Sequence, residues 1–170
     1  GRDMKILTTV VTLAAMSAPA AAELVVRFDE GAPKDRFSIV NTGACAFGAM
    51  TVKIDLNGSA GGLIFDVTGQ GAGVEVFQPL ELVAGRDVVA EVPNVADGDT
   101  EVSLKLTGLG PNASVAFTID VDDTAGRSET MVNSSEISGA SVVVSYDGGD
   151  VTGSFDAAPV ANVPLVGCNA

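Results

Sequence analysis

The sequence predicts an all-β protein: an antiparallel β-sandwich, immunoglobulin-like or jelly-roll, with roughly nine to ten short strands. Three observations predict this fold class. Apolar and polar residues alternate with a period of two, clusters of Gly, Asn and Asp separate the alternating segments, and no convincing amphipathic helix follows residue 22. A closed β-barrel is the second architecture that fits this pattern.

Each alternating segment has the pattern of a strand with one dry face and one wet face. These segments are residues 24–28, 52–57, 101–107 and 115–122. Residues 141–146 and 150–156 are expected to form two further strands. Turn signals such as Asn57-Gly58 and the stretch 108–112 separate them. The turn signal Asp147-Gly148-Gly149 predicts a hairpin between residues 141–146 and 150–156.

The first residues indicate an export signal rather than part of the fold. Met4 and Lys5 open a short basic region, residues 6–16 are apolar, and a small-residue stretch ends in an A-x-A-like site at Ala22. The apolar run is shorter than the about 20 residues that span a bilayer. We therefore expect residues 1–22 to be removed and residues 23–170 to form a single β-sandwich domain. The protein would be secreted, either extracellular or periplasmic.

Export bears on the two cysteines, Cys45 and Cys168. An oxidising compartment favours a disulfide between them, and the bridge would tie the C-terminus to an early loop. Closing so long a loop contributes about 5 kcal/mol in the loop-entropy model. Two free thiols are the alternative.

Composition excludes several functions. The chain of 170 residues has no His and no Trp, and 22 acidic against 9 basic side chains give a formal net charge of −13. Without His, neither Ser–His–Asp nor Cys–His catalysis nor a His-ligated zinc or iron site can form. The charge disfavours nucleic acid and anionic membrane as partners. An aromatic content of 5% provides little to line the cleft of a glycosidase. We expect a protein that is not an enzyme and does not insert into membranes.

Two acidic clusters are the candidate sites. In the first, Glu30 and Asp35 flank a predicted turn; in the second, Asp120, Asp122 and Asp123 end the clearest predicted strand. Asp120 and Asp122 share one strand face, because side chains repeat every two residues. Carboxylates in loops at strand ends suit calcium, which takes about six to eight oxygen ligands.

If the two clusters meet at one edge of the sandwich, their side chains form a calcium site. The predicted ligands are Glu30, Asp35, Asp120, Asp122 and Asp123. The alternative is that the first cluster pairs with its neighbours Lys34 and Arg36 and that the other acids are simply solvated.

One segment resembles a known family. It runs Phe28-Asp29-Glu30-Gly31-Ala32-Pro33-Lys34-Asp35-Arg36-Phe37 and continues Ser38-Ile39-Val40-Asn41-Thr42-Gly43. This run is similar to secreted bacterial aggregation-factor-core-like proteins, which are named after the core protein of the sponge aggregation factor. The resemblance continues through residues 73–79 and 117–124. It implies an extracellular β-sandwich, an adhesion module, and calcium as the natural cofactor.

These observations predict a secreted, non-catalytic adhesion or aggregation module that calcium stabilises. Its expected partner is an extracellular glycan or protein, or a second copy of the chain. Two alternatives stay open. A carbohydrate-binding module would use polar side chains such as Asn41, Gln78 or Asn94, and a structural exoprotein would self-associate through exposed strand edges.

Overall fold

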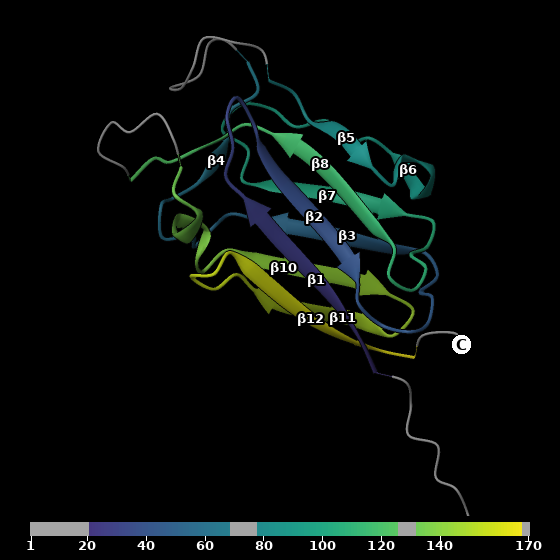
Figure 1. Ribbon diagram of the computed structural model, residues 1–170. Coiled ribbons are helices and arrows are strands. Elements are labelled where there is room, and N and C mark those ends of the chain that lie inside the picture. Colours follow the sequence, from purple (N-terminus) through teal and green to yellow (C-terminus); the bar gives the residue numbers. More distant parts are fainter. Residues whose placement is uncertain (1–20, 69–77, 126–131, 168–170) are drawn as a thin grey trace, which may run out of the picture.

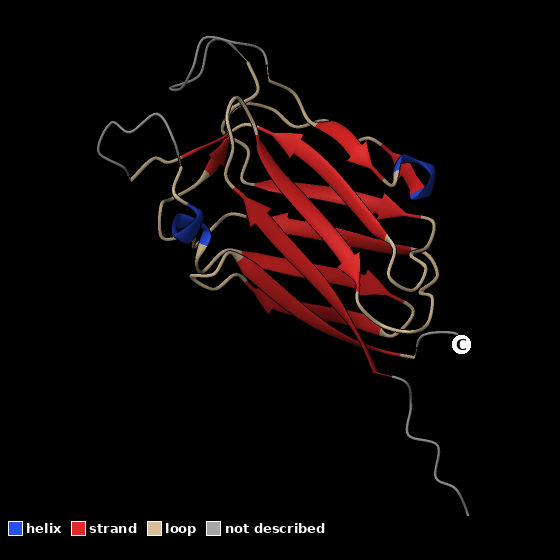
Figure 2. Ribbon diagram, in the orientation of Figure 1, coloured by secondary structure: helices blue, strands red, loops and turns tan. Residues whose placement is uncertain are grey.

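The computed structural model describes residues 21–68, 78–125 and 132–167. Within these ranges the chain forms two five-stranded antiparallel sheets and one two-stranded ribbon. The two large sheets lie as two layers (Figures 1 and 2). The predicted all-β antiparallel class is therefore confirmed. Because each large sheet has two edge strands, the described part of the chain is layered and is not closed into a barrel.

The strands follow a different order in space than along the chain. The first sheet runs β12 (Val160–Val166), β1 (Ala21–Asp29), β2 (Asp35–Asn41), β8 (Ser114–Ile119) and β5 (Glu81–Ala84). The second runs β11 (Gly149–Ser154), β10 (Ser141–Tyr146), β3 (Met50–Asp55), β7 (Glu101–Leu106) and β6 (Val89–Glu91). The ribbon pairs β4 (Ile64–Phe65) with β9 (Val121–Asp122), and the 3-10 helices are η1 (Arg86–Val88) and η2 (Ser134–Ile137).

The strand count differs from the prediction. The described residues contain twelve strands, more than the nine or ten expected. β4 and β9 have two residues each and β6 has three, too few to show an alternating pattern. The predicted strand 115–122 is also interrupted, because β8 ends at Ile119 and the chain turns into the ribbon at Asp120.

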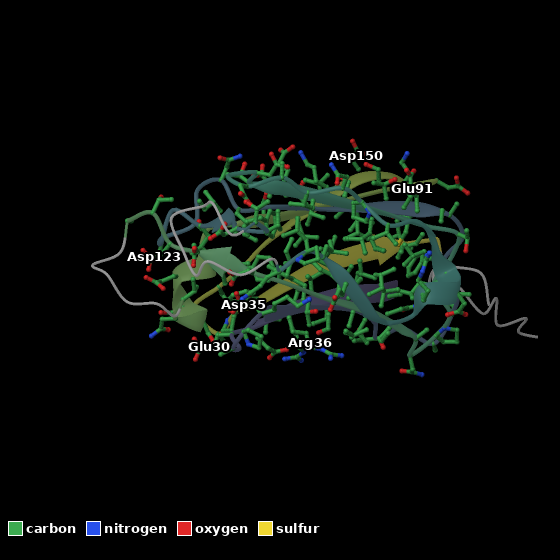
Figure 3. All side chains as sticks on the ribbon, turned by 90° about the horizontal axis from the view of Figure 1, so that it is seen from above. Glu30, Asp35, Arg36, Glu91, Asp123 and Asp150 are labelled. Carbon is green, nitrogen blue, oxygen red and sulfur yellow. The ribbon has the colours of Figure 1, made fainter. Side chains whose placement is uncertain are left out.

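The core lies between the two layers, as the side chains in Figure 3 show. In β7, Val102, Leu104 and Leu106 are buried while the residues between them are exposed, so the predicted alternation is confirmed there. Aromatic rings fill one part of the core. The ring of Phe37 stacks on that of Phe117 with 5.2 Å between the ring centroids, and it lies tilted against the ring of Phe28 with 5.0 Å between the centroids. Burying each such side chain contributes roughly 1.5–3 kcal/mol.

The predicted hairpin is confirmed. β10 and β11 pair antiparallel, and Tyr146 lies opposite Gly149, so Asp147 and Gly148 form a two-residue loop. Gly149 has a φ of 100°, which a residue with a Cβ rarely adopts. The loop is therefore the tight connection that its Asp-Gly-Gly sequence predicts.

The predicted export signal and the predicted disulfide both involve the ends of the chain. Residues 1–20 lie outside the described residues, whereas Ala22 is buried in β1 and pairs with Leu165. Ala21 and Ala22, assigned to the signal, are thus part of the first sheet. Cys45 is buried and no described cysteine is a free thiol, but Cys168 lies outside the described residues, so their bridge stays a prediction. No helix within the described ranges is long and apolar enough to cross a membrane.

Candidate metal centre

The ribbon brings together chain segments from both sheets. β4 follows β3 of the second sheet, and β9 follows β8 of the first. In the ribbon, Phe65 lies opposite Val121, and the N–H of Asp66 donates to the carbonyl of Asp120 at 3.1 Å. The ladder therefore continues for one residue beyond the two strands and sets Asp66 against Asp120.

Alternation along the ribbon places three acidic side chains on one face. Phe65 and Val121 are buried in the core. Because successive side chains of a strand point to opposite faces, Asp66, Asp120 and Asp122 project from the other face. One carboxylate oxygen from each of these three aspartates lies within 4.8 Å of the others. We call this group the aspartate triad.

The aspartate triad is electrostatically strained. Like charges directly opposite in a ladder destabilise it, and two unit charges at such distances repel by about 3 kcal/mol near a protein surface. Burial raises the pKa of Asp120 to about 6, and the charge of Asp66 adds to this rise. Burial is also the main cause that raises the pKa of Asp122 to about 6. The hydrogen bond with the Asp66 carboxyl group and the charge of Asp120 add to this rise. Oδ2 of Asp122 is buried and has no hydrogen-bond partner among the described residues.

Asp35 lies beside the aspartate triad, and its carboxylate accepts hydrogen bonds from backbone N–H groups. It begins β2 and is only 4% exposed. Its Oδ1 accepts the N–H of Gly31 and its Oδ2 accepts the N–H of Val121, both at 3.0 Å. Burial raises its pKa to about 7; the two N–H groups oppose the rise, and the charges of Asp120 and Asp122 add to it.

The other two predicted ligands lie at the same end of the molecule, outside the triad. Figure 3 shows Glu30, Asp35 and Asp123 at that end. Oε2 of Glu30 accepts the N–H of Ser134 at 2.7 Å, at the start of η2. Asp123 is half-buried, and its charge contributes to the raised pKa of Asp122. The two sequence clusters thus approach each other, but of the five predicted ligands only Asp120 and Asp122 are in the three-carboxylate group.

The two ion pairs between described residues involve other acids. Among the described residues, the ion pairs are Lys34–Glu81 at 2.6 Å and Lys53–Glu101 at 3.0 Å. Lys34, a sequence neighbour of Asp35, reaches across to β5 instead and also donates to the carbonyl of Pro79. Lys34 and Lys53 therefore pair with glutamates of the sheets and not with Asp120 or Asp122.

Asp66 is the member of the aspartate triad that is absent from the predicted ligands. It stands between Phe65 and Val67 in the apolar run 63–67 and is 2% exposed. A single carboxylate inside such a run is a signal in itself, because a buried charge is costly unless it is paired or bound to a metal. Only the pairing of β4 with β9 identifies its partners.

Of the three polar residues predicted for carbohydrate binding, Asn41 and Gln78 are buried and Asn94 is exposed. Asn41 is fully buried, and its amide donates to the carbonyls of Cys45, Leu109 and Gly110 while its oxygen accepts the N–H of Gly43. Its hydrogen-bonding capacity is therefore used within the fold.

Chemically, the aspartate triad offers three hard oxygen donors that can share protons or hold a divalent cation. Its donors come from a ribbon whose backbone bonds are made within the fold, so their positions are set before any ion arrives. No protein-family model and no curated protein matches the chain at a significant level, so the interpretation of the site rests on its geometry.

Proposed function

We propose that the protein is a secreted, non-catalytic module whose fold is stabilised by calcium bound between Asp66, Asp120 and Asp122. The observation that carries the proposal is the convergence of these three carboxylates at the ribbon that joins the two sheets. Burial, and after it the charges of neighbouring aspartates, raises the pKa of Asp120 and Asp122, and a cation there would stabilise their ionised forms.

The donor set favours calcium over other metals. All three side-chain donors are carboxylate oxygens, and the chain contains no His. Soft or borderline metals prefer nitrogen and sulfur ligands, and magnesium demands a near-ideal octahedron. Calcium tolerates irregular sets of oxygens completed by water. Asp120 and Asp122 are half-buried, so water can reach the site.

Calcium at this position would connect the two layers. Asp66 follows β4, which extends from the second sheet, and Asp120 and Asp122 come from the chain that leaves the first. A ligand that binds only the folded state raises its stability by about 2.7 kcal/mol at one hundred times its Kd. We therefore expect calcium to stabilise the sandwich against unfolding.

The module's role is adhesion or aggregation, with an extracellular glycan or protein or a second copy as its partner. The resemblance at residues 28–43 supports this role, as does the predicted export signal. The strand edges favour binding through side-chain surfaces over strand addition. β5 and β6 are short and irregular in register, and the edge strand β12 contains Pro164, which has no N–H to donate. Such edges resist pairing between chains.

Calorimetric titration with calcium after EGTA treatment, with paired thermal melts, tests the metal proposal. We expect a Kd of about 10⁻⁴–10⁻³ M, as in other extracellular calcium modules, and a melting temperature that rises by several degrees. Asp122→Asn should weaken binding at least about tenfold because it removes a charged ligand. Asp150→Asn is the charge-matched control, since Asp150 is exposed on β11. Absence of both heat and melting shift in the wild type would overturn the proposal.

Aggregation of beads coated with the protein tests the adhesion role separately. Coated beads should cluster in calcium and disperse in EGTA, and Asp122→Asn beads should need more calcium than Asp150→Asn beads. The beads are tested with and without added cells or glycans. If they stay dispersed in every case while calorimetry detects calcium binding, the protein is a metal-stabilised domain without this adhesive role.

A further inference from the structure

Two carboxylates outside the aspartate triad hold the peptide groups that follow two of its members. Asp35 Oδ2 accepts the N–H of Val121, the residue after Asp120, at 3.0 Å. Asp97 Oδ1 accepts the N–H of Val67, the residue after Asp66, at 2.7 Å. Neither belongs to the three-carboxylate group. We propose that Asp35 and Asp97 are positioning residues for the calcium site, an inference that rests on the proposed function.

Asp35 holds the β9 side of the ribbon. It comes from β2 in the first sheet, and its second oxygen accepts the N–H of Gly31 in the turn that precedes that strand. The buried carboxylate therefore ties three things together: the β1–β2 turn, the start of β2, and the peptide between Asp120 and Val121. Rotation of this peptide would move the Asp120 carboxylate away from Asp66 and Asp122, and it would break the hydrogen bond from the N–H of Val121 to Asp35.

Asp97 holds the β4 side. Besides the N–H of Val67, its Oδ1 accepts the N–H of Thr68 at 2.8 Å, and its Oδ2 accepts the Thr68 hydroxyl. The same loop pairs with Phe65 through two backbone bonds: the N–H of Phe65 donates to the carbonyl of Asp99, and the N–H of Gly98 donates to the carbonyl of Phe65. The segment 65–68 is thus held by this loop as well as by β9.

These bonds oppose the motion that the triad's own repulsion favours. Three carboxylates whose oxygens lie within 4.8 Å of one another tend to separate when no cation is present. Outer groups that orient metal ligands typically contribute about 10–100-fold to metal affinity. Asp35 and Asp97 also add negative charge near the cation without touching it. Asp35 is buried and Asp97 is exposed, so solvent screens Asp97 more strongly.

Asp35→Asn and Asp97→Asn in the full chain test this inference by calcium calorimetry and by melts in EGTA. We expect calcium affinity to fall about 10–100-fold for Asp35→Asn and by a smaller factor for Asp97→Asn. The matched control is Asp156→Asn. Asp156 also accepts two backbone N–H groups, from Ala158 and Val160, but neither residue adjoins a triad member. Its substitution should leave calcium affinity unchanged.

The readouts separate positioning from a merely structural role. A structural role would lower the melting temperature in EGTA and leave the calcium affinity of the folded protein unchanged, and that result would overturn the inference. If Asp122→Asn loses binding while both positioning variants bind like the wild type, the inference is wrong and the proposed function stands. If the wild type binds no calcium, both are wrong. Should Asp35→Asn fail to fold, the exposed Asp97 gives the answer.

Discussion

Strand β2 carries a buried polar side chain at each end, and the two are satisfied in opposite ways. Asn41 ends the strand with a neutral amide whose three acceptors and one donor all lie within the fold. Asp35 begins the strand with a carboxylate that accepts two N–H groups but faces the charges of Asp120 and Asp122. Both side chains are almost inaccessible to solvent.

The difference predicts that stability at the Asn41 end is insensitive to pH and calcium and that stability at the Asp35 end depends on both. A buried neutral amide with all its bonds made adds rigidity at any pH. A buried carboxylate beside other carboxylates stores repulsion, which a proton or a cation relieves. Changes at the Asn41 end should therefore affect stability alone, whereas changes at the Asp35 end should alter the response to pH and calcium.

The largest expected effect comes from Asn41→Ala. It removes the bonds that Asn41 makes to the carbonyls of Cys45, Leu109 and Gly110 and to the N–H of Gly43. The carbonyls of Leu109 and Gly110 still accept the N–H groups of Phe47 and Ala113. We expect the free energy of unfolding to fall by about 5 kcal/mol, since each unsatisfied buried group costs about 1–3 kcal/mol and each other lost hydrogen bond about 1 kcal/mol. Urea unfolding with and without calcium measures this. Equal losses in both conditions support the comparison, and a loss below about 1 kcal/mol contradicts it.

The pH dependence of stability in EGTA is the next largest effect. The pKa of Asp35 is raised from 3.8 to about 7, and those of Asp120 and Asp122 from 3.8 to about 6. Between these values the folded protein binds more protons than the unfolded chain, so its stability is greatest at low pH and falls as the pH rises through 6 and 7. For buried Asp35 the fall corresponds to about 4 kcal/mol. The half-exposed pair contributes less, because solvent screens it.

Urea unfolding at pH 5 and pH 8 in EGTA tests this profile. Saturating calcium should remove the part of the fall that comes from Asp120 and Asp122, since the cation binds their ionised carboxylates, and should reduce the part that comes from the neighbouring Asp35. Asp35→Asn should flatten the profile in EGTA, whereas Asn41→Ala should shift it downward without changing its slope. Equal stability of the wild type at both pH values would show that the Asp35 end does not store the repulsion inferred here.

Much of the fold was predictable because its longer strands face a shared core. The period-two pattern survives in β7 and in β10, where Val142 and Val144 are buried between the layers and Tyr146 is partly buried. The ribbon was not predictable in the same way. β4 and β9 have two residues each, and their pairing is a long-range contact that no local pattern encodes. The same contact ends β8 at Ile119 and interrupts the predicted strand 115–122.

The candidate site was predictable where it depends on local geometry. Asp120 and Asp122 share a face because they are two residues apart on an extended chain. Asp66 joins them only through the ribbon. Glu30 is equally acidic in sequence, but the N–H of Ser134 at the start of η2 engages it. Local acidity therefore indicated the correct end of the molecule and could not determine which carboxylates converge.

The smallest expected effect is that of Tyr146→Phe, which tests whether the two ends are independent. Tyr146 lies near the Asn41 end: its ring packs edge-on against Phe47, and Phe47 pairs with Leu109, whose carbonyl Asn41 binds. The variant loses one partly exposed hydrogen bond, from the N–H of Val166 at 3.1 Å, and keeps the ring.

The free energy of unfolding should therefore fall by about 1 kcal/mol or less. Calcium affinity and the calcium-induced rise in melting temperature should match the wild type, because no charge near the aspartate triad changes. Calorimetry and paired melts check both values. A change in calcium affinity would mean that strain at the Tyr146 end reaches the ribbon through the sheets, and the Asp35 end would then not be a separate, condition-dependent unit.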